Sequence, residues 1–146
     1  MATADRNFDG LGAHFQNKIY RSPKGKIRLR VLQADFQEQL PELNQHPATI
    51  LDAGSGQGQF SLQLATQGHT LFLSDLSQEM VVQAQSNFAE AGQNATFLHS
   101  PIQSLPTQLS QSFDLILNHA VLEWCEEPRT IIKTLTSMLA PGGALS

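Results

Sequence analysis

A glycine-rich segment in the middle of the chain restricts the possible folds more than any other feature. It follows the short apolar run Thr49–Leu51 and precedes an amphipathic stretch from about Gln59 to Thr66. Glycine adopts positive φ angles and lets the backbone approach a ligand closely. Such a loop between a strand and a helix is the context in which backbone groups bind a ligand. The segment is Leu51-Asp52-Ala53-Gly54-Ser55-Gly56-Gln57-Gly58.

Strand-like and helix-like segments alternate along the chain from about residue 46 onward. Apolar runs bounded by turn residues predict strands, and helical periodicity with capping residues predicts the segments between them. The alternation indicates an α/β fold, a parallel sheet with helices on both faces joined by right-handed crossovers. The predicted strands are 49–51, 70–75, 95–98 and 113–117, and the predicted helices are 59–66, 77–91 and 128–139.

Capping residues define the ends of two predicted helices. Ser77 is the expected N-cap of the second helix, with Glu79 in the first turn, where a negative charge is favourable. Pro128 is expected near the start of the third helix, and Pro141-Gly142-Gly143 is expected to end it.

Asp75 stands at the predicted end of the second strand, roughly 20 residues beyond the glycine loop, where a carboxylate can accept hydrogen bonds from both ribose hydroxyls of an adenosine. A turn or helix-capping acid is the alternative interpretation. The order of strand, loop and acid favours the ribose role.

The dinucleotide fingerprint needs glycine or alanine where Gln59 stands, whereas glycine occurs one residue earlier at Gly58. A nicotinamide-dependent oxidoreductase is therefore disfavoured.

The first 45 residues show helical spacing of apolar side chains and are expected to form a helical segment preceding the sheet. Residues 1–30 carry seven of the nine lysines and arginines but only two acids, although the whole chain has a net charge of −4. A basic segment on an acidic body suggests an anionic partner, and a solvated helix face is the alternative.

Composition excludes several classes of protein. Cys125 is the only cysteine, so no internal disulfide is possible, and a cytoplasmic protein is the simplest expectation. No apolar run approaches the about 20 residues that span a bilayer, and residues 1–10 lack the apolar stretch of a signal peptide. The histidines are scattered without metal-ligand spacing, so no metal site is predicted. They are His14, His46, His69, His99 and His119.

Five blocks of residues together resemble a specific family. The pattern Asp-x-Gly-x-Gly-x-Gly is that of the first motif in S-adenosylmethionine (SAM) methyltransferases, and the flanking blocks are more specific. The chain resembles the bacterial tRNA 5-carboxymethoxyuridine methyltransferases along nearly its whole length. The blocks are Arg6-Asn7-Phe8-Asp9, Lys24-Gly25-Lys26-Ile27-Arg28, Leu51-Asp52-Ala53-Gly54, Asp75-Leu76-Ser77 and His119-Ala120-Val121-Leu122-Glu123-Trp124.

The resemblance implies a Rossmann-like methyltransferase fold with strand order 3-2-1-4-5-7-6. Residues 1–45 would form a helical segment over the cofactor and facing RNA, and residues 46–146 the Rossmann-like SAM-binding domain. The chain would stop at the first residues of the fifth strand, with the C-terminal part absent. The strand at 113–117 would then lie near an open apolar edge, which favours self-association into a homo-oligomer.

The resemblance also implies a reaction, in which SAM methylates the carboxylate of 5-carboxymethoxyuridine at the tRNA wobble position and leaves S-adenosylhomocysteine. No catalytic residue is expected, because a carboxylate with a pKa near 4 is already ionised at pH 7. Ser55 and Gln57 replace a glycine and an acid usual in the family loop, and Ile102 replaces a small residue. The implied cofactor contacts are Arg28, Asp52, Gly54, Ser55, Gly56, Asp75, Leu76, Ile102, Gln103 and His119.

Simpler roles remain open for three of these residues. Arg28 can pair with the cofactor carboxylate or belong to a basic helix face. Gln103 can contact the adenine edge or lie on a helix surface, and His119 can face the cofactor or only pack. Two other functions also remain open, a methyltransferase acting on a small acid and a cofactor-binding module that completes no catalytic cycle alone.

Overall fold

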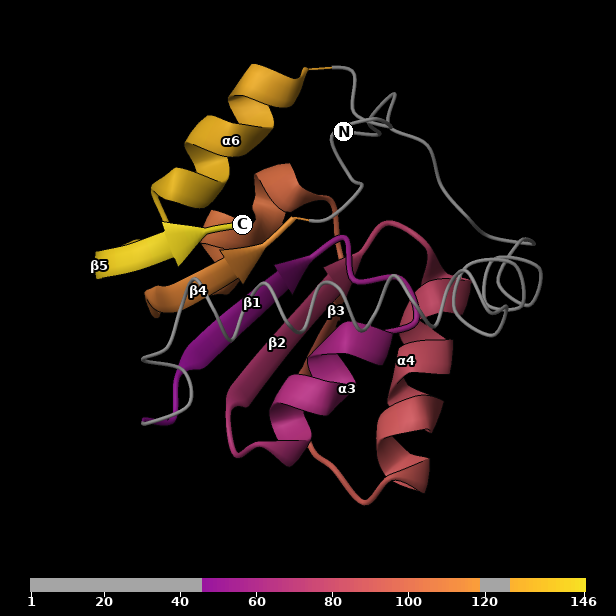
Figure 1. The fold of residues 1–146 in the computed structure, drawn as a ribbon. Helices are drawn as coiled ribbons and strands as arrows, with labels where there is room; N and C mark the ends of the chain where they lie inside the picture. The colour runs from indigo at the N-terminus through magenta and orange to yellow at the C-terminus, as the bar shows by residue number, and fades with distance from the viewer. Residues whose placement is uncertain (1–45, 119–126) are drawn as a thin grey trace, which may run out of the picture.

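Five parallel strands form one sheet in the order β3-β2-β1-β4-β5 (Figure 1). The computed structural model describes residues 46–118 and 127–146. The predicted helical segment 1–45 with Arg28, and also His119, lie outside the described residues. The observed order confirms the one predicted for the first five strands. The strands are β1 (Thr49–Ala53), β2 (Thr70–Asp75), β3 (Thr96–His99), β4 (Phe113–Leu117) and β5 (Leu139–Leu145).

The central strand β1 is buried on both faces. It pairs in parallel with β2 on one side and with β4 on the other. Ile50 and Leu51 point to opposite faces and are both fully buried, each in a different apolar cluster. Strands covered on both faces need a continuous apolar run, which explains why this part of the sequence does not alternate.

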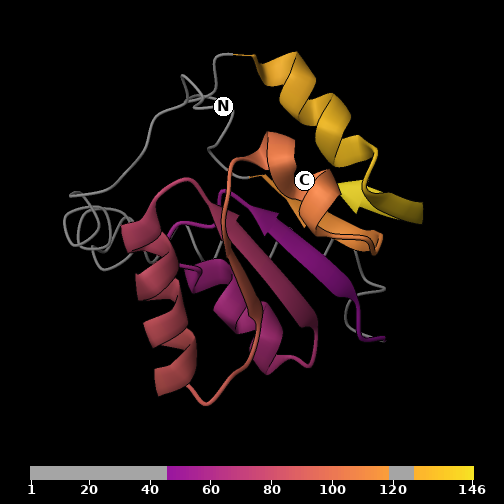
Figure 2. The ribbon, with the colours of Figure 1, turned by 180° about the vertical axis from the view of Figure 1, so that it is seen from behind.

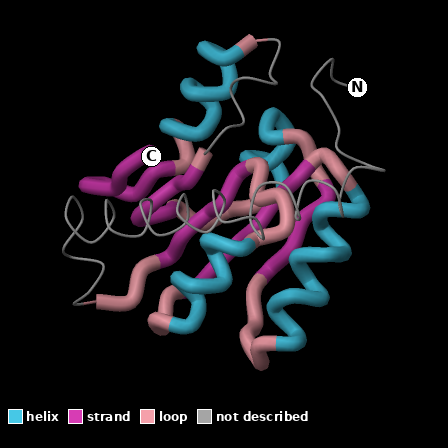
Figure 3. Tube along the Cα trace, turned by 45° about the vertical axis from the view of Figure 1, so that its right-hand side comes forward, coloured by secondary structure: helices cyan, strands magenta, loops and turns pink. Residues whose placement is uncertain are grey.

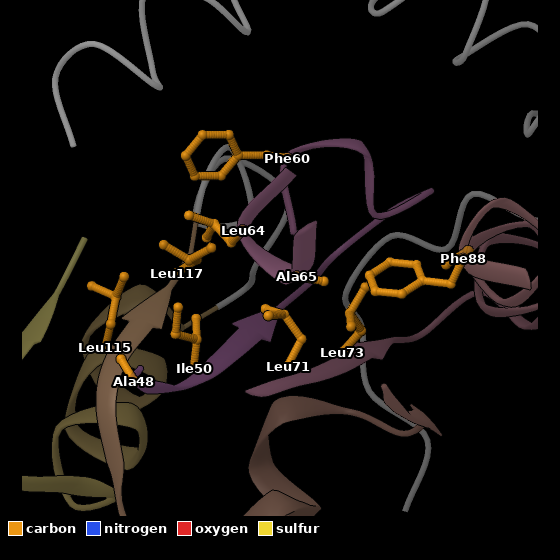
Figure 4. Close-up of a cluster of buried hydrophobic side chains, with 11 residues drawn as sticks. Ala48, Ile50, Phe60, Leu64, Ala65, Leu71, Leu73, Phe88, Leu115 and Leu117 are labelled. Carbon is orange, nitrogen blue, oxygen red and sulfur yellow. The ribbon is translucent and has the colours of Figure 1, made fainter. Parts of the chain in front are cut away.

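Helices α3 (Gln59–Thr66) and α4 (Gln78–Glu90) cover one face of the sheet (Figure 1). Both have the predicted extent to within a residue or two. Phe60 and Leu64 of α3 and Phe88 of α4 pack on the side chains of β1, β2 and β4 that point to this face. Figure 4 shows this cluster, in which Phe88 lies beside Leu73 of β2.

The short helices η3 (Ile102–Ser104) and α5 (Leu105–Gln108) cover the other face together with α6 (Pro128–Thr136). Figure 2 shows this face, and Figure 3 shows helices on both sides of the strands. Leu105 and Ile131 are fully buried there against Phe113 of β4. The ring of Phe113 meets Phe72 edge to face at 5.3 Å between centroids. The predicted arrangement of helices on both faces is therefore confirmed.

Ser77 is the N-cap of α4, as predicted. Its hydroxyl accepts a hydrogen bond from the backbone N–H of Met80 at 3.2 Å, and Glu79 lies in the first turn. The Ser77 hydroxyl pairs one of the backbone N–H groups that have no partner within the helix. The negative charge of Glu79 interacts favourably with the positive end of the helix dipole.

The last segment of the chain corrects a prediction. Helix α6 ends at Thr136, and Pro141-Gly142-Gly143 lies inside β5 instead of ending a helix. β5 is an outer strand of the described sheet, where a residue without an N–H is tolerated. A Cβ on Gly143 would lie 2.8 Å from the carbonyl oxygen of Phe113, so glycine permits the close approach.

β5 also changes what was expected of β4. The fifth strand extends over seven residues and pairs with β4, with a register shift between Phe113 and Leu115. β4 is therefore an inner strand of the described sheet, one strand away from the edge at β5, and self-association into a homo-oligomer stays a prediction. In the described ranges, no helix is long and apolar enough to cross a membrane.

Candidate functional site

The candidate site lies at the carboxyl edge of the sheet, where the glycine loop joins β1 to α3. Three glycines of the loop have positive φ angles, 79° at Gly54, 57° at Gly56 and 72° at Gly58. At Gly58 a Cβ would also come within 2.8 Å of the Leu73 side chain. Glycine is therefore required there both for conformation and for the approach of α3 to β2.

Backbone hydrogen bonds hold the loop against the end of β2. The N–H groups of Gly54 and Ser55 both donate to the carbonyl oxygen of Ser74, at 2.8 and 2.9 Å. The N–H of Gly56 donates to Oδ2 of Asp75 at 2.8 Å. The loop and Asp75 therefore form one unit, as their spacing in the sequence predicted.

Asp75 joins the loop to the start of α4. Its Oδ1 accepts a hydrogen bond from the backbone N–H of Ser77 at 2.9 Å, while its Oδ2 accepts from Gly56. The side chain is only 7% exposed. Asp75 therefore does act as a turn and capping acid, because its carboxylate accepts from two backbone N–H groups. Its role in binding a ribose stays a prediction.

Asp52 at the end of β1 is a buried carboxyl group with one strong partner. The Ser61 hydroxyl of α3 donates to its Oδ2 at 2.6 Å. Burial raises the pKa of Asp52 from 3.8 to about 7, and the negative charge of Asp75 acts in the same direction, whereas the Ser61 hydrogen bond acts to lower it. A cation bound nearby would favour the ionised form of this carboxyl.

Three further polar atoms are buried at the same edge. The hydroxyl oxygens of Ser55 and Ser74 and the Oδ1 of Asn118 have no hydrogen-bond partner within the described part of the chain. They follow or end β1, β2 and β4, which are adjacent strands. Buried polar groups are normally paired, so an edge with three such atoms suits a ligand that has its own donors and acceptors.

Among the described residues, the other predicted contacts are Leu76, Ile102 and Gln103, which follow β2 and β3, and two bonds that were not predicted hold this region together. Nε2 of His99 lies 2.8 Å from the carbonyl oxygen of Leu76, and a ring N–H must donate there because a carbonyl only accepts. Ser100 N–H donates to the carbonyl of Asp75 at 3.0 Å, which holds the ends of β2 and β3 together. Ile102 is buried in the apolar cluster under α6, and Gln103 is exposed.

The structure thus brings Asp52, Asp75 and the loop glycines to one edge, with Leu76 beside them. It also adds residues that the sequence did not reveal as part of the site. Ser61 binds Asp52, and Asn87 of α4 donates through Nδ2 to the carbonyl of Gln57 at 3.0 Å. Nothing in the local pattern marks these side chains, because each acts across a tertiary contact.

Comparison with known proteins identifies the class. A family model described as "Methyltransferase domain" matches residues 51–146. The chain therefore belongs to the methyltransferase domain family, and its five-stranded parallel sheet is the Rossmann-like fold of SAM-dependent methyltransferases.

Among curated relatives, the chain is 40% identical over 144 residues to tRNA 5-carboxymethoxyuridine methyltransferase of Escherichia coli K12, a match covering 97% of this chain and 55% of the relative. It is 34% identical over 100 residues to malonyl-[acyl-carrier protein] O-methyltransferase of Pseudescherichia vulneris, covering 68% and 38%. The chain thus spans about half the length of the E. coli relative.

Two solved structures show the same fold. An S-adenosylmethionine-dependent methyltransferase from Clostridium acetobutylicum superposes with a TM-score of 0.75 at 23% identity, covering 91% of this chain and 54% of that one. Magnesium protoporphyrin IX methyltransferase from Synechocystis with bound SAH gives 0.74 at 23% identity, covering 90% and 64%. At this level of identity the likeness supports the fold alone.

Proposed function

We propose that the chain binds SAM at the carboxyl edge of the sheet and forms the cofactor-binding part of a tRNA methyltransferase. Its substrate would be the carboxylate of 5-carboxymethoxyuridine at the wobble position, converted to the methyl ester. The main evidence for SAM as the cofactor is the hydrogen bond from the Gly56 N–H to Asp75, which joins the glycine loop to the acid at the end of β2. The substrate rests on the 40% identity to the E. coli enzyme across 97% of this chain.

The chemistry of the edge fits SAM. The Asp75 carboxylate is an acceptor for ribose hydroxyls, and Gly54 and Gly56 let a ligand approach the backbone. Asp75, together with Asp52 once it is ionised, supplies negative charge beside a cofactor that carries a sulfonium and an ammonium group. The buried atoms of Ser55, Ser74 and Asn118 provide hydrogen-bonding capacity that the described protein groups leave unused.

The remaining predicted contacts complete the proposal. Leu76 and Ile102 would border the adenine, with Ile102 contributing backbone atoms because its side chain packs in the core. Gln103 is exposed and free to turn toward the adenine edge. Arg28 would pair with the cofactor carboxylate and His119 would face the cofactor from the end of β4.

The chain's own residues need to orient and shield the reactants more than to move protons. When bound, SAM supplies an electrophilic methyl group on its sulfonium. A substrate carboxylate has a pKa near 4 and is already ionised at pH 7, so no general base is required. Alignment of the carboxylate with the methyl group and exclusion of water then account for the acceleration.

Isothermal titration calorimetry of this chain with SAM, SAH and NAD tests the cofactor. We expect both SAM and SAH to bind and NAD not to bind, because Gln59 stands where the dinucleotide fingerprint needs a small residue. Binding of NAD in preference to SAM would overturn the assignment.

The basic segment supports RNA as the partner, and a tRNA substrate fits a cytoplasmic location. Lys18, Arg21, Lys24 and Lys26 would contact phosphates. In a form with the full length of the E. coli relative, reversing these four charges should weaken binding of undermodified tRNA and flatten its salt dependence. SAM affinity should stay nearly unchanged in that variant. Unchanged tRNA binding would indicate a solvated face instead.

A methyltransferase acting on a small acid is the second candidate. It is suggested by the 34% identity to malonyl-[acyl-carrier protein] O-methyltransferase, whose named substrate is a malonyl group on a carrier protein and not an RNA. A methyl-transfer assay with undermodified tRNA and with small carboxylic acids, run on a chain extended to the full length of the E. coli relative, separates the two candidates. Transfer to the acids alone would select the second.

A further inference from the structure

Helix α4 contacts the glycine loop through polar side chains as well as through its apolar face. Nδ2 of Asn87 donates to the main-chain carbonyl of Gln57 at 3.0 Å, and the side-chain amides of Gln57 and Gln83 are hydrogen-bonded to each other. Gln57 is fully buried, with 0% exposure. The peptide between the second and third loop glycines is therefore held from the side of α4.

The helical repeat places these contacts on one face of α4. Gln83 and Asn87 are four residues apart and so lie one above the other on the helix. Ala84 and Phe88, each one residue further along, come close to Gly58, where a Cβ would lie 3.4 and 3.3 Å from them. The same side of α4 thus packs against Gly58 through Ala84 and Phe88 and binds the backbone of Gln57 through Asn87.

The loop is consequently held from two directions. Asp75 binds the Gly56 N–H from the end of β2, and Asn87 binds the Gln57 carbonyl from α4. The same Asp75 also binds the N–H of Ser77, the residue that caps α4. The loop, the acid and the helix therefore form a closed set of contacts that keeps the peptide 56–58 in one conformation.

We propose that Asn87 and Gln83 are positioning residues that pre-form the cofactor-binding conformation of the loop. This inference rests on the proposed role of the loop in binding SAM. Neither side chain is among the groups assigned to cofactor contact. A loop already held in its binding conformation loses less conformational entropy when a ligand binds, so these side chains would raise affinity at a distance.

The chemistry of the two bonds makes different demands on the two side chains. The Gln57 carbonyl can only accept, so residue 87 must donate. Two amides can share a bond in either sense, so residue 83 can serve as an acceptor. Aspartate at 87 would therefore break its bond, whereas glutamate at 83 would preserve one.

The test compares Asn87→Asp and Asn87→Leu with Gln83→Met and Gln83→Glu. SAM affinity is measured by calorimetry, and exchange of the Gly56 and Gly58 amide hydrogens by NMR or mass spectrometry. Loss of one hydrogen bond should weaken SAM binding by about three- to tenfold in both Asn87 variants and in Gln83→Met. Gln83→Glu should recover most of the affinity lost in Gln83→Met, and the loop amides should exchange faster wherever affinity falls.

Two matched controls separate positioning from general effects. Gln85→Glu adds a charge to the exposed face of α4 and should leave SAM affinity unchanged. Asp114→Ala removes a similar side-chain-to-backbone bond, 2.9 Å long, to Thr49 N–H at the opposite end of β1. It should lower the unfolding temperature without weakening SAM binding.

Each contrary result identifies what has failed. If the Asn87 variants bind SAM as the wild type does while Asp75→Ala binds weakly, the positioning role is wrong and the cofactor site stands. If Asp114→Ala weakens binding as much as Asn87→Leu, the effect is one of stability, and the proposal is overturned. If the wild-type chain binds no SAM, the proposed function fails, and unchanged amide exchange in Asn87→Leu would then refute the restraint as well.

Discussion

The two ends of the sheet differ sharply in what they bury. At the carboxyl end, Asp52, Asp75, Ser55, Ser74 and Asn118 are all buried polar side chains. At the amino end, His69 is the buried polar side chain, with 6% exposure, and it accepts from the Ala48 N–H at 3.0 Å, whereas Asp114 accepts from the Thr49 N–H at the surface. Between the ends, the strands are apolar on both faces. Stabilising apolar packing therefore occupies the body of the sheet, and costly polar burial is concentrated at the candidate site.

The difference supports our proposal that the carboxyl edge binds a ligand. A fold optimised only for stability would replace a carboxyl group whose pKa is raised by burial. Substitutions in the apolar body of the sheet should accordingly lower stability, whereas substitutions at the carboxyl edge should mainly lower SAM affinity. Four predictions test this separation.

The largest effect is expected in the body of the sheet. Phe113→Ala removes a fully buried ring that packs against Phe72 and the α6 face. The free energy of unfolding should fall by about 3–5 kcal/mol, as is typical for deletion of a buried aromatic ring. Chemical denaturation measures this loss. A decrease below about 1 kcal/mol would contradict the packing described here.

At the carboxyl edge, Asp75→Ala should mainly affect ligand binding. The variant loses the partners of Gly56 N–H and Ser77 N–H and the predicted ribose acceptor. SAM affinity should fall by about 1.5–3 kcal/mol of binding free energy, measured by calorimetry. Unchanged affinity, in a variant shown to be folded by circular dichroism, would remove Asp75 from the site.

Asp52→Asn should change the free energy of unfolding and the SAM affinity in opposite directions, and both changes should depend on pH. The pKa of Asp52 is raised to about 7, above its ordinary value of 3.8, so its contribution to stability is full below about pH 4 and is lost as the pH rises through about 7. One proton limits the slope to about 1.4 kcal/mol per pH unit. The asparagine variant, which still accepts from Ser61, should therefore be more stable than the wild type at pH 8.

The same variant should bind SAM more weakly. A cationic cofactor favours the ionised carboxyl, so wild-type affinity should rise between pH 6 and pH 8 while that of Asp52→Asn stays flat. Thermal unfolding and calorimetry at both pH values provide the two measurements. A stability gain that does not depend on pH would contradict the raised pKa.

The smallest effect is expected at the amino end. Asp114→Ala removes one exposed hydrogen bond to the Thr49 N–H, and stability should fall by about 0.5–1.5 kcal/mol. SAM affinity should not change, because the bond lies at the end of β1 remote from the loop. Weaker SAM binding in this variant would show that the two ends of the sheet are coupled.

Local patterns in the sequence were sufficient for most of the described fold. Helices α3 and α4, the cap of α4 at Ser77 and strands β1, β2 and β4 follow from apolar runs, turn residues and capping residues. These signals act over a few residues, so they can be recognised without knowledge of the rest of the chain. The pairing of the glycine loop with Asp75 was also predictable, because parallel βα units bring successive strand ends to one edge.

Local sequence patterns gave the wrong structure where pairing with a neighbouring strand determined the conformation. Pro141-Gly142-Gly143 is a typical helix terminator, yet it lies in β5 because β4 offers a partner and the glycine permits the backbone of β5 to approach the Phe113 carbonyl. Local propensity cannot include this contact, since it joins residues about 30 positions apart in the chain.

By itself, the sequence determined the α/β class, the glycine loop, the acid that ends β2 and the family to which the chain belongs. Only the tertiary structure decided which side chains support the loop and which carboxyl is hard to ionise. Ser61 reaches Asp52 and Asn87 reaches Gln57 because α3 and α4 pack side by side on one face of the sheet. Burial, which raises the pKa of Asp52, is likewise a property of the assembled layers, because desolvation depends on everything packed around a group and not on its neighbours in the chain.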